Sequence, residues 1–377
     1  MKICLVTSRV PPTRDGVGDY TYHLGRELAR RGPVTIVTTV GQRAVDGRDG
    51  LTVLPIVPRW DAAGVRTLVD LARETRPSLL DLQWVPFLWG RGGINPWIPR
   101  AVLALRRAGI RVVTTVHEPY VPFTYWKWWA AGPIQRLQLW TIVAASHRTA
   151  VTIPAWVDML RRRVPWRRRD IFWLPAGSNV PRAVTSDDAR RRQRAEWGLG
   201  DDGVVLTLFS PMGSGKLLDW VAQAWRALRH DARLRLLVIG PDRPDVRARL
   251  ADAADPRVID TGYVATDAVS RLLACSDVLL APFVDGMSSR RTSVISALEH
   301  ALPVVTTSGR LSDPMFADSP LVRVPVTSAD AFTVEVRRLV ADAAERRRLG
   351  AAAREFWAAH FAWPVIADRL LHHADVA

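Results

Sequence analysis

Short apolar runs alternate with longer amphipathic stretches along almost the whole chain. Ile3 to Thr7, Val34 to Thr39 and Arg111 to Val116 are apolar runs of strand length. Asp19 to Arg31 and Ile98 to Ala108 carry apolar residues at helical spacing. Repeated strand and helix units with short connections predict a parallel sheet covered by helices on both faces. In such a sheet, ligands bind at the carboxyl ends of the strands.

The pattern begins again after a turn-rich segment, Pro175 to Pro181. A strand is expected at Val204 to Phe209, and helices are expected at Leu218 to Leu228 and Val246 to Ala253. A length of 377 residues also suits two domains better than one. The expected fold class is therefore α/β, with two Rossmann-like, doubly wound domains facing across a cleft.

The stretch from Leu279 to Thr307 predicts a strand, a loop, a helix and a second strand. Its loop contains Arg290 and Arg291, and it ends at Ser293, where a helix is expected to begin. Hydroxyls, backbone N–H groups at a helix start and two guanidinium groups together favour binding of an anion, most naturally a diphosphate. The alternative is a solvated loop whose Ser or Thr caps the helix.

Three further loops follow predicted strands. Gly16 and Gly18 would let backbone N–H groups approach a phosphate or a sugar. His117 and Glu118 offer an imidazole and a carboxylate suited to acid–base chemistry, with a structural histidine as the alternative. The loop ending at Lys216 lacks the first glycine and the final Ser or Thr of a P-loop, which leaves a cation and backbone donors facing an anion.

Aromatic residues and arginines gather in the first half of the chain. Trp126, Trp128 and Trp129 surround one lysine, a composition typical of interfacial segments or of a satellite core beneath a loop. Arginine runs at 161–163 and 167–169 suit lipid headgroups or solvated helix ends. A formal net charge of +15 favours polyanions or an anionic membrane face, although an arginine-rich genome gives the same charge without a partner.

Composition excludes several classes of protein. A hydrophobic content of 48% with 24% charged residues is that of a globular chain. The two cysteines, Cys4 and Cys275, argue against a disulfide framework or a zinc site and favour a reducing compartment. No apolar run approaches the roughly 20 residues of a membrane-spanning helix, and no signal-peptide core follows Lys2. The expected location is the cytoplasm, with the inner membrane face as a contact.

Several motifs together resemble glycosyltransferase family 4, whose members have the two-domain GT-B architecture. The likeness rests on PPTRDGVGDYTYHLGRELARRG, VVTTVHEPY, LPAGSNVP, GSGKLLDWVAQAWRAL, LLVIGP, TGYVATDAVSRLLACSDVLLAPFVDGMSSRRTSVISALEHALPVVTT and HFAWPVIADRLL. Their order and spacing carry the resemblance over nearly the whole chain, since no single motif is decisive.

The resemblance implies an acceptor domain at residues 1–178, a nucleotide-sugar donor domain at 179–355, and a helix within 356–377 that crosses back to the first domain. It implies a hexosyltransferase that uses a UDP-, GDP- or other NDP-sugar and a glycan, lipid-linked or small-molecule acceptor. It also implies retention of configuration and no metal or other cofactor. Nucleic acid is not an expected partner.

The candidate site residues combine this resemblance with the strand-end pattern. The catalytic candidates are His117, Asp285 and Glu118; the donor-binding candidates are Gly16, Gly18, Lys216, Arg290, Arg291, Ser293 and Glu299; the acceptor-binding candidates are Tyr20, Trp84, Tyr120 and Trp126.

The sequence departs from the family pattern at its two usual glutamates. Counted back from Pro303, their positions fall on Ser288 and Ser296, with Glu299 one helical turn later. Their loss favours the main alternative, a degenerate, non-catalytic nucleotide or glycan binder of the same fold. A nucleotide-sugar epimerase and a nucleic-acid-binding protein are further alternatives, and the latter lacks a recognition module.

A subgroup of the family carries a D-G-x-S-x-R-R-x-S loop, which this sequence matches from Asp285 to Ser293. The arginine that normally precedes the family's lysine is absent here. We therefore hypothesise that Arg290 or Arg291 supplies the missing cation and that Asp285 contacts the sugar.

Overall fold

The structure is a computed structural model that describes residues 1–123, 128–209, 215–240, 250 and 255–375. The chain divides into two compact units. Unit 1 comprises Met1–Ala176 together with Trp363–Ala377, and unit 2 comprises Gly177–Ala362. Each unit is built around its own sheet.

Unit 1 contains an eight-stranded sheet in the order β3-β4-β2-β1-β5-β6-β7-β8. All neighbouring strands are parallel except β3, which pairs antiparallel with β4. The strands are β1 (Ile3–Val6), β2 (Val34–Thr39), β3 (Val45–Asp46), β4 (Leu51–Val57), β5 (Leu79–Trp84), β6 (Val112–Val116), β7 (Arg148–Val151) and β8 (Ile171–Trp173).

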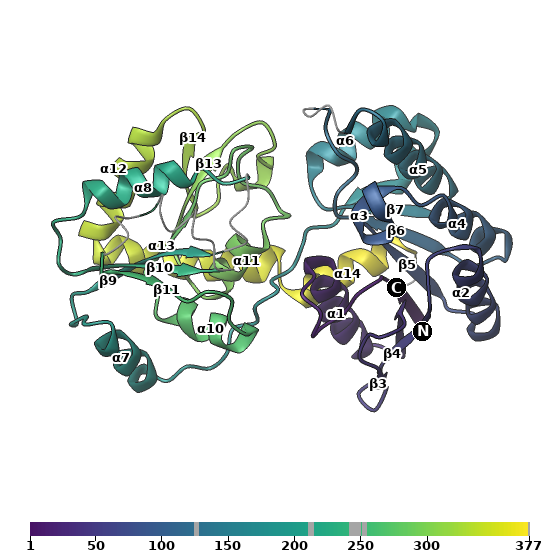
Figure 1. Cartoon of the computed structure of the whole chain (residues 1–377), viewed down its shortest axis with the longest axis horizontal. Helices are drawn as coiled ribbons and strands as arrows, with labels where there is room; N and C mark the ends of the chain where they lie inside the picture. Colours follow the sequence, from purple (N-terminus) through teal and green to yellow (C-terminus); the bar gives the residue numbers. More distant parts are fainter. Residues whose placement is uncertain (124–127, 210–214, 241–249, 251–254, 376–377) are drawn as a thin grey trace. The chain divides into compact units, whose positions relative to one another are not determined.

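Helices cover both faces of this sheet. They are α1 (Gly16–Ala29), α2 (Ala62–Thr75), α3 (Pro86–Trp89), α4 (Trp97–Arg107), α5 (Ala131–Ala145), α6 (Pro154–Arg163) and α14 (Trp363–His373), with 3-10 turns η1 (Arg91–Gly93) and η3 (Pro165–Asp170). Helix α14, drawn in yellow, lies beside α1, whereas α2, α4 and α5 lie on the other side (Figure 1). The last helix of the chain therefore packs against the first.

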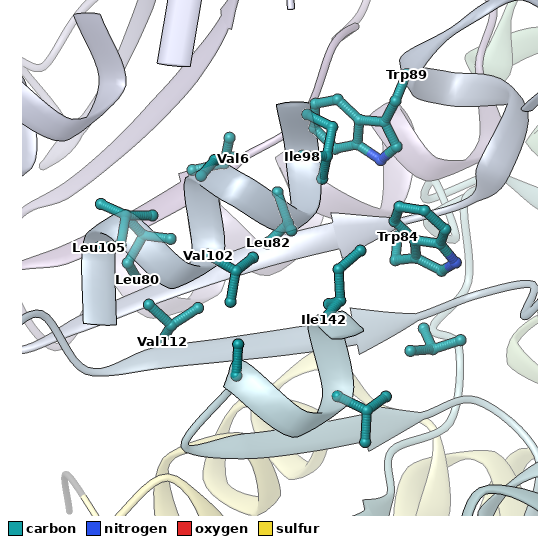
Figure 2. Packing of buried hydrophobic residues seen from close by; sticks show 14 of the residues in the cluster. Val6, Leu80, Leu82, Trp84, Trp89, Ile98, Val102, Leu105, Val112 and Ile142 are labelled. Atoms are coloured by element: carbon teal, nitrogen blue, oxygen red, sulfur yellow. The ribbon is translucent and has the colours of Figure 1, made fainter. Parts of the chain in front are cut away.

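One hydrophobic core of unit 1 lies between the sheet and helices α4 and α5. Figure 2 shows side chains of β5 such as Leu80 and Leu82 meeting Val102 of α4 and Ile142 of α5. All four are at most 2% exposed. Burying one such aliphatic side chain contributes about 1.5–3 kcal/mol, so these contacts hold the central strands rigidly in place.

Unit 2 contains a six-stranded, fully parallel sheet in the order β11-β10-β9-β12-β13-β14. Its strands are β9 (Val204–Phe209), β10 (Leu234–Ile239), β11 (Val258–Asp260), β12 (Val278–Ala281), β13 (Val304–Ser308) and β14 (Val322–Pro325). Its helices are α7 (Asp187–Glu196), α8 (Leu218–Ala227), α10 (Thr266–Ala274), α11 (Thr292–Glu299), α12 (Ala329–Ala341) and α13 (Ala343–His360), with the 3-10 turn η4 (Pro314–Phe316). Helices α8 and α12 cover one face, and α10 lies on the other (Figure 1).

Each sheet has one point at which the chain reverses its direction of strand addition. In unit 1, the strands grow from β1 to β2 and β4, and the chain then returns to place β5 beside β1. In unit 2, they grow from β9 to β10 and β11 before β12 pairs with β9. Loops separate at the carboxyl ends of such strand pairs, and ligands bind there in open α/β sheets.

The predicted fold class is confirmed, with two Rossmann-like parallel sheets covered by helices. The predicted helix from Val246 to Ala253 lies largely outside the described residues. Within the part of the chain that the structure describes, no helix is both long and apolar enough to cross a membrane.

Candidate active site

Lys216 lies in unit 2 after β9, one of the two strands at the reversal point. Its backbone pairs with Phe283, which follows the other strand, β12. The Lys216 Nζ donates a hydrogen bond to the Phe209 carbonyl oxygen at 3.0 Å and lies 5.6 Å from the centre of the Phe283 ring. The amine is thus held between the two loops where the fold favours a ligand.

Lys216 is 8% exposed, and burial lowers the pKa of its amine to about 7. A smaller part of this lowering comes from Arg291, because two cations close together disfavour each other's charge. An anion placed beside both groups would reverse these effects. The lowered pKa of Lys216 therefore marks this loop as a candidate anion-binding site.

Asp285 joins the two arginines of the loop that follows β12. Its Oδ2 accepts a hydrogen bond from Arg290 Nη2 at 2.9 Å, and its Oδ1 accepts one from Arg291 Nη2. The Arg291 guanidinium also stacks 4.2 Å from the centre of the Phe283 ring. With side-chain exposures of 16–21%, the three charged groups form a partly buried cluster with one net positive charge. In this geometry, Asp285 holds both arginine side chains in place.

The loop from Asp285 to Ser293, called the arginine loop below, is supported by residues that follow β13. The Asp313 carboxylate accepts hydrogen bonds from the Ser289 backbone N–H at 2.6 Å and from the Ser289 hydroxyl. Gly286 has a φ of +89°, and a Cβ there would lie 2.2 Å from the Ser312 hydroxyl oxygen. Only glycine suits this position, because it needs a left-handed backbone and a close approach. The loop geometry is therefore fixed from outside the loop.

Asp313 is a residue of the candidate site that the sequence analysis missed. It is 2% exposed, and burial raises the pKa of its carboxyl group to about 6. It lies 24 positions after Ser289, so no local motif links the two. The only sign of Asp313 in the sequence is an isolated acidic residue shortly after a predicted buried strand.

The helix after the arginine loop separates two of the predicted donor-binding residues. Ser293 is buried in the first turn of α11, beside Arg291. Glu299 lies at the other end of α11, where its Oε1 accepts a hydrogen bond from the Arg182 backbone N–H at 3.1 Å. Burial raises the pKa of the Glu299 carboxyl group. The structure therefore brings Ser293 to the arginines but ties Glu299 to the segment after residue 177.

In unit 1, His117 follows β6, which pairs with β5 beside the reversal point. Its Nε2 lies 2.8 Å from Gln83 Oε1, at the end of β5. Burial lowers the pKa of the imidazole to about 3, so the ring is neutral across the physiological range. A neutral imidazole can accept or donate a hydrogen bond to a sugar hydroxyl without carrying charge.

Aromatic side chains of α1 and α14 hold His117 from one side. The Tyr20 ring meets the imidazole edge-on, with centroids 4.7 Å apart, and Trp363 lies 5.3 Å from Tyr20. Tyr20 is 1% exposed, and its hydroxyl has no hydrogen-bond partner among the described residues. Tyr20 thus positions His117 and has little surface for an acceptor.

Gly16 and Gly18, in the loop after β1, serve the start of helix α1 in this structure. Helix α1 begins at Gly16, and the Asp15 carboxylate caps it by accepting hydrogen bonds from the Val17 and Gly18 N–H groups at 3.1 and 2.8 Å. A Cβ at Gly18 would lie 2.7 Å from the Arg9 carbonyl oxygen. Gly18 is therefore required by the close approach of the preceding loop, and Asp15 takes up its N–H group.

The remaining predicted site residues lie in different environments. Trp84 is 1% exposed and donates a hydrogen bond to the Pro119 carbonyl at 3.2 Å, so it belongs to the core and offers no surface to an acceptor. Tyr120 is half-buried under the Arg136 guanidinium, 4.0 Å from the ring centre. Glu118 is exposed beside His117. Trp126 lies outside the described residues.

The described side chains were also compared with the arrangements that hold metal ions. No group of three or more His, Cys, Asp or Glu residues among them is arranged to hold a metal ion. The positive charge of the unit 2 site comes from Lys216, Arg290 and Arg291.

Two family models match consecutive parts of the chain. Residues 14–180 match Glycosyltransferase Family 4, and residues 204–342 match Glycosyl transferases group 1. Together with the two Rossmann-like sheets, these matches identify the chain as a glycosyltransferase of the GT-B type. They disfavour the alternative of a non-catalytic binder.

Two curated relatives align over nearly the full length of the chain. One, from Mycolicibacterium hassiacum, is described as an MMP alpha-(1->4)-mannosyltransferase and is 25% identical over 407 aligned residues, which cover 97% of this chain and 96% of the relative. The other, from Mycolicibacterium smegmatis, is a GDP-mannose-dependent alpha-(1-6)-phosphatidylinositol monomannoside mannosyltransferase and is 24% identical with the same coverage.

Solved structures share the fold over the whole chain. Sucrose-phosphate synthase from Thermosynechococcus elongatus superposes with a TM-score of 0.71 at 18% identity, covering 99% of this chain and 98% of that one. Anabaena Alr3699/HepE in complex with UDP and glucose superposes with a TM-score of 0.72 at 13% identity, covering 100% of both chains. These likenesses concern the fold.

Proposed function

We propose that this glycosyltransferase moves a hexose, with mannose as the first candidate, from a nucleoside-diphosphate sugar to an acceptor hydroxyl. Both curated relatives are described as mannosyltransferases, and one of them as dependent on GDP-mannose. Several structural neighbours contain UDP or a UDP-sugar. Donors of this kind share a diphosphate, so the proposal depends on a site that recognises one.

The observation that carries the proposal is the group of three cations at the reversal point of unit 2. Lys216 follows β9, and Arg290 and Arg291 follow β12, where Asp285 holds both guanidinium groups. Transfer breaks the bond between the sugar's anomeric carbon and the diphosphate oxygen, and negative charge develops on the leaving diphosphate. Fixed cations stabilise that charge without reorganisation, so we propose that transfer needs no metal.

The unit 1 site suits an uncharged, hydroxyl-bearing ligand. The neutral His117 imidazole, held by Gln83 and Tyr20, offers a hydrogen bond to a hydroxyl. We propose retention of configuration, in which the leaving diphosphate takes the acceptor's proton. This route needs no carboxylate base, and Glu118 then has no obligatory role.

A panel of donors tests this function. Purified chain is incubated with UDP-, GDP-, ADP- and TDP-sugars, and slow donor hydrolysis is followed by release of the nucleoside diphosphate. We expect one nucleotide class to bind and hydrolyse, with GDP-mannose foremost, and we expect excess EDTA to leave the rate unchanged. Failure of every donor to bind at millimolar concentration would contradict the proposal.

An exposed apolar surface in unit 1 suggests where a lipid-linked acceptor is presented. Trp129 and Leu137 are 66% and 63% exposed, and Phe123 and Ile134 are also exposed. Leu137 lies three positions after Ile134, so both face outward from α5. Exposed aromatic and aliphatic side chains of this kind are typical of segments that enter a membrane interface.

The arginines at 161–163 and 167–169 differ in whether they bond to the protein itself or face solvent. Arg161 donates hydrogen bonds to the Ile171 carbonyl, and Arg167 pairs with Asp170 at 3.3 Å, so these two support the fold. Arg162 and Arg168 are exposed. We propose that such exposed arginines and the apolar surface contact an anionic membrane face that carries the acceptor.

Vesicle sedimentation tests the membrane contact. Wild-type chain should sediment with phosphatidylglycerol-containing vesicles, and the Trp129→Ser/Leu137→Ser variant should lose most of this binding, since it removes the two most exposed apolar side chains of this surface. Val334→Ser is the matched control, because Val334 is 59% exposed on unit 2. Equal sedimentation of wild type and the double variant would refute the proposed surface.

A further inference from the structure

A chain of hydrogen bonds connects His117 to a carboxylate inside the unit 1 sheet. Asp81 lies in the middle of β5 and is inaccessible to solvent. The Thr115 hydroxyl, on the neighbouring strand β6, lies 2.9 and 3.0 Å from the two Asp81 oxygens. Gln83 Nε2 donates to Asp81 Oδ2 at 2.7 Å, and Gln83 Oε1 faces His117 Nε2. A polar chain thus runs along two adjacent strands to the candidate catalytic histidine.

The direction of each hydrogen bond follows from the charge on Asp81. An ionised carboxylate only accepts hydrogen bonds, so it requires the amide nitrogen of Gln83 to face it. The amide oxygen must then face His117, and an oxygen only accepts. The His117 Nε2 therefore carries the proton, and the lone pair of the ring lies on Nδ1.

A neutral group at position 81 permits the opposite arrangement. A protonated acid or an amide can donate a hydrogen bond to the Gln83 oxygen if the Gln83 amide turns over. The Gln83 nitrogen would then donate to His117 Nε2, and the proton of the ring would move to Nδ1. The ionised carboxylate thus requires the proton on Nε2 of His117, whereas a neutral residue 81 also allows the proton on Nδ1.

We propose that Asp81 is a positioning residue that sets the tautomer of His117 through Gln83. The inference rests on the proposed transferase function, since it assigns His117 to that site. Asp81 does not touch substrate in this account. It acts by fixing which edge of the imidazole is a donor and which is an acceptor.

The surroundings of Asp81 support a change of state near neutral pH. Burial raises the pKa of the Asp81 carboxyl group to about 7, although the hydrogen bonds from Thr115 and Gln83 lower it. The other titratable groups that face this region are Tyr20 of α1, whose pKa is raised partly by Asp81, and the neutral His117. Among the described residues, no basic side chain contributes to the shift of Asp81.

The tautomer can be measured directly by long-range ¹H–¹⁵N NMR of the histidine rings, with the His117 signals assigned from a His117→Ala variant. At pH 8, the wild type should show only the Nε2–H tautomer, and Asp81→Asn should show a substantial Nδ1–H fraction. In the unmodified protein, lowering the pH from 8 to 6 should raise the Nδ1–H fraction. This titration needs no variant, so it does not depend on whether Asp81→Asn folds.

Kinetics provides the second readout. Asp81→Asn should lower kcat roughly tenfold or more while the donor KM stays within about twofold. We expect the wild type to lose activity below pH 7, where Asp81 takes up a proton, and we expect Asp81→Asn to lack this pH dependence. Asp70→Asn, the same change at an exposed position on α2 of the same unit, is the matched control and should behave as wild type. A folded Asp81→Asn protein with the wild-type tautomer and pH profile would overturn the inference. A wild type that shows the tautomer change but transfers no sugar would instead refute the proposed function.

Discussion

Replacing both Arg290 and Arg291 by alanine is expected to weaken binding of the donor by roughly 10²-fold or more, because each charge-assisted hydrogen bond contributes about 1.5–3 kcal/mol. Both guanidinium groups are fixed by Asp285 and are less than a quarter exposed. They are therefore preorganised and screened little by solvent. Calorimetric titration of the nucleotide sugar identified by the donor panel measures the loss.

The double variant also leaves Asp285 without its two cations, and an unpaired carboxylate would itself repel a diphosphate. Adding Asp285→Asn to the double variant separates the two effects. If repulsion caused the loss, the triple variant would regain affinity; if the arginines bind the donor, it would not. Arg271→Ala, at an exposed position on α10 of the same unit, is the matched control. Unchanged donor affinity in the double variant would exclude the arginines from the site.

Lys216→Met is expected to weaken donor binding by a similar factor and to remove most of its dependence on pH. In the wild type, the pKa of Lys216 is lowered to about 7 in the free protein, and a bound diphosphate must raise it. Protonation and donor binding therefore favour each other. As the pH rises above 7, the dissociation constant of the wild type should increase by up to about tenfold per pH unit. Titrations at several values between pH 6.5 and 8.5 measure this slope.

The same substitution should change stability in the opposite direction. Because the pKa of Lys216 in the folded state lies below its usual 10.5, the charged amine destabilises the fold below pH 7, and this penalty disappears as the pH rises from 7 towards 10. Lys216→Met should therefore raise the Tm at pH 6.5 while it lowers donor affinity. Lys2→Met, at an exposed position in unit 1, should change neither. A lowered Tm in Lys216→Met would show that Lys216 supports the fold.

The features that the sequence predicted well depend on local periodicity. Alternating strand and helix patterns predicted both sheets, and the rule that ligands bind at carboxyl strand ends placed His117 and Lys216 on the loops where the structure has them. The same pattern could not show side-chain direction. Trp84 follows Gln83 directly, yet the indole turns into the core while the amide reaches His117.

The residues that the sequence analysis missed act across strands. Asp81 lies inside a stretch of strand length, and its partner Thr115 lies 34 positions away on the next strand. The hydrogen bonds that Asp313 accepts from the arginine loop are likewise long-range. Pairing between strands fixes such contacts, so they become visible only once the strand order is known. Gly18 differs from these residues, because its constraints are local in sequence. A side chain there would meet the Arg9 carbonyl, and its N–H group already bonds to the helix cap.

Donor binding to the full chain tests the central claim most directly. The donor selected from the panel is titrated at pH 6.5 into the wild type, Lys216→Met and the Arg290→Ala/Arg291→Ala variant. We predict one donor per chain for the wild type and a loss of about 10²-fold or more for each variant. If all three proteins bind the donor equally, the cations of unit 2 do not form the diphosphate site.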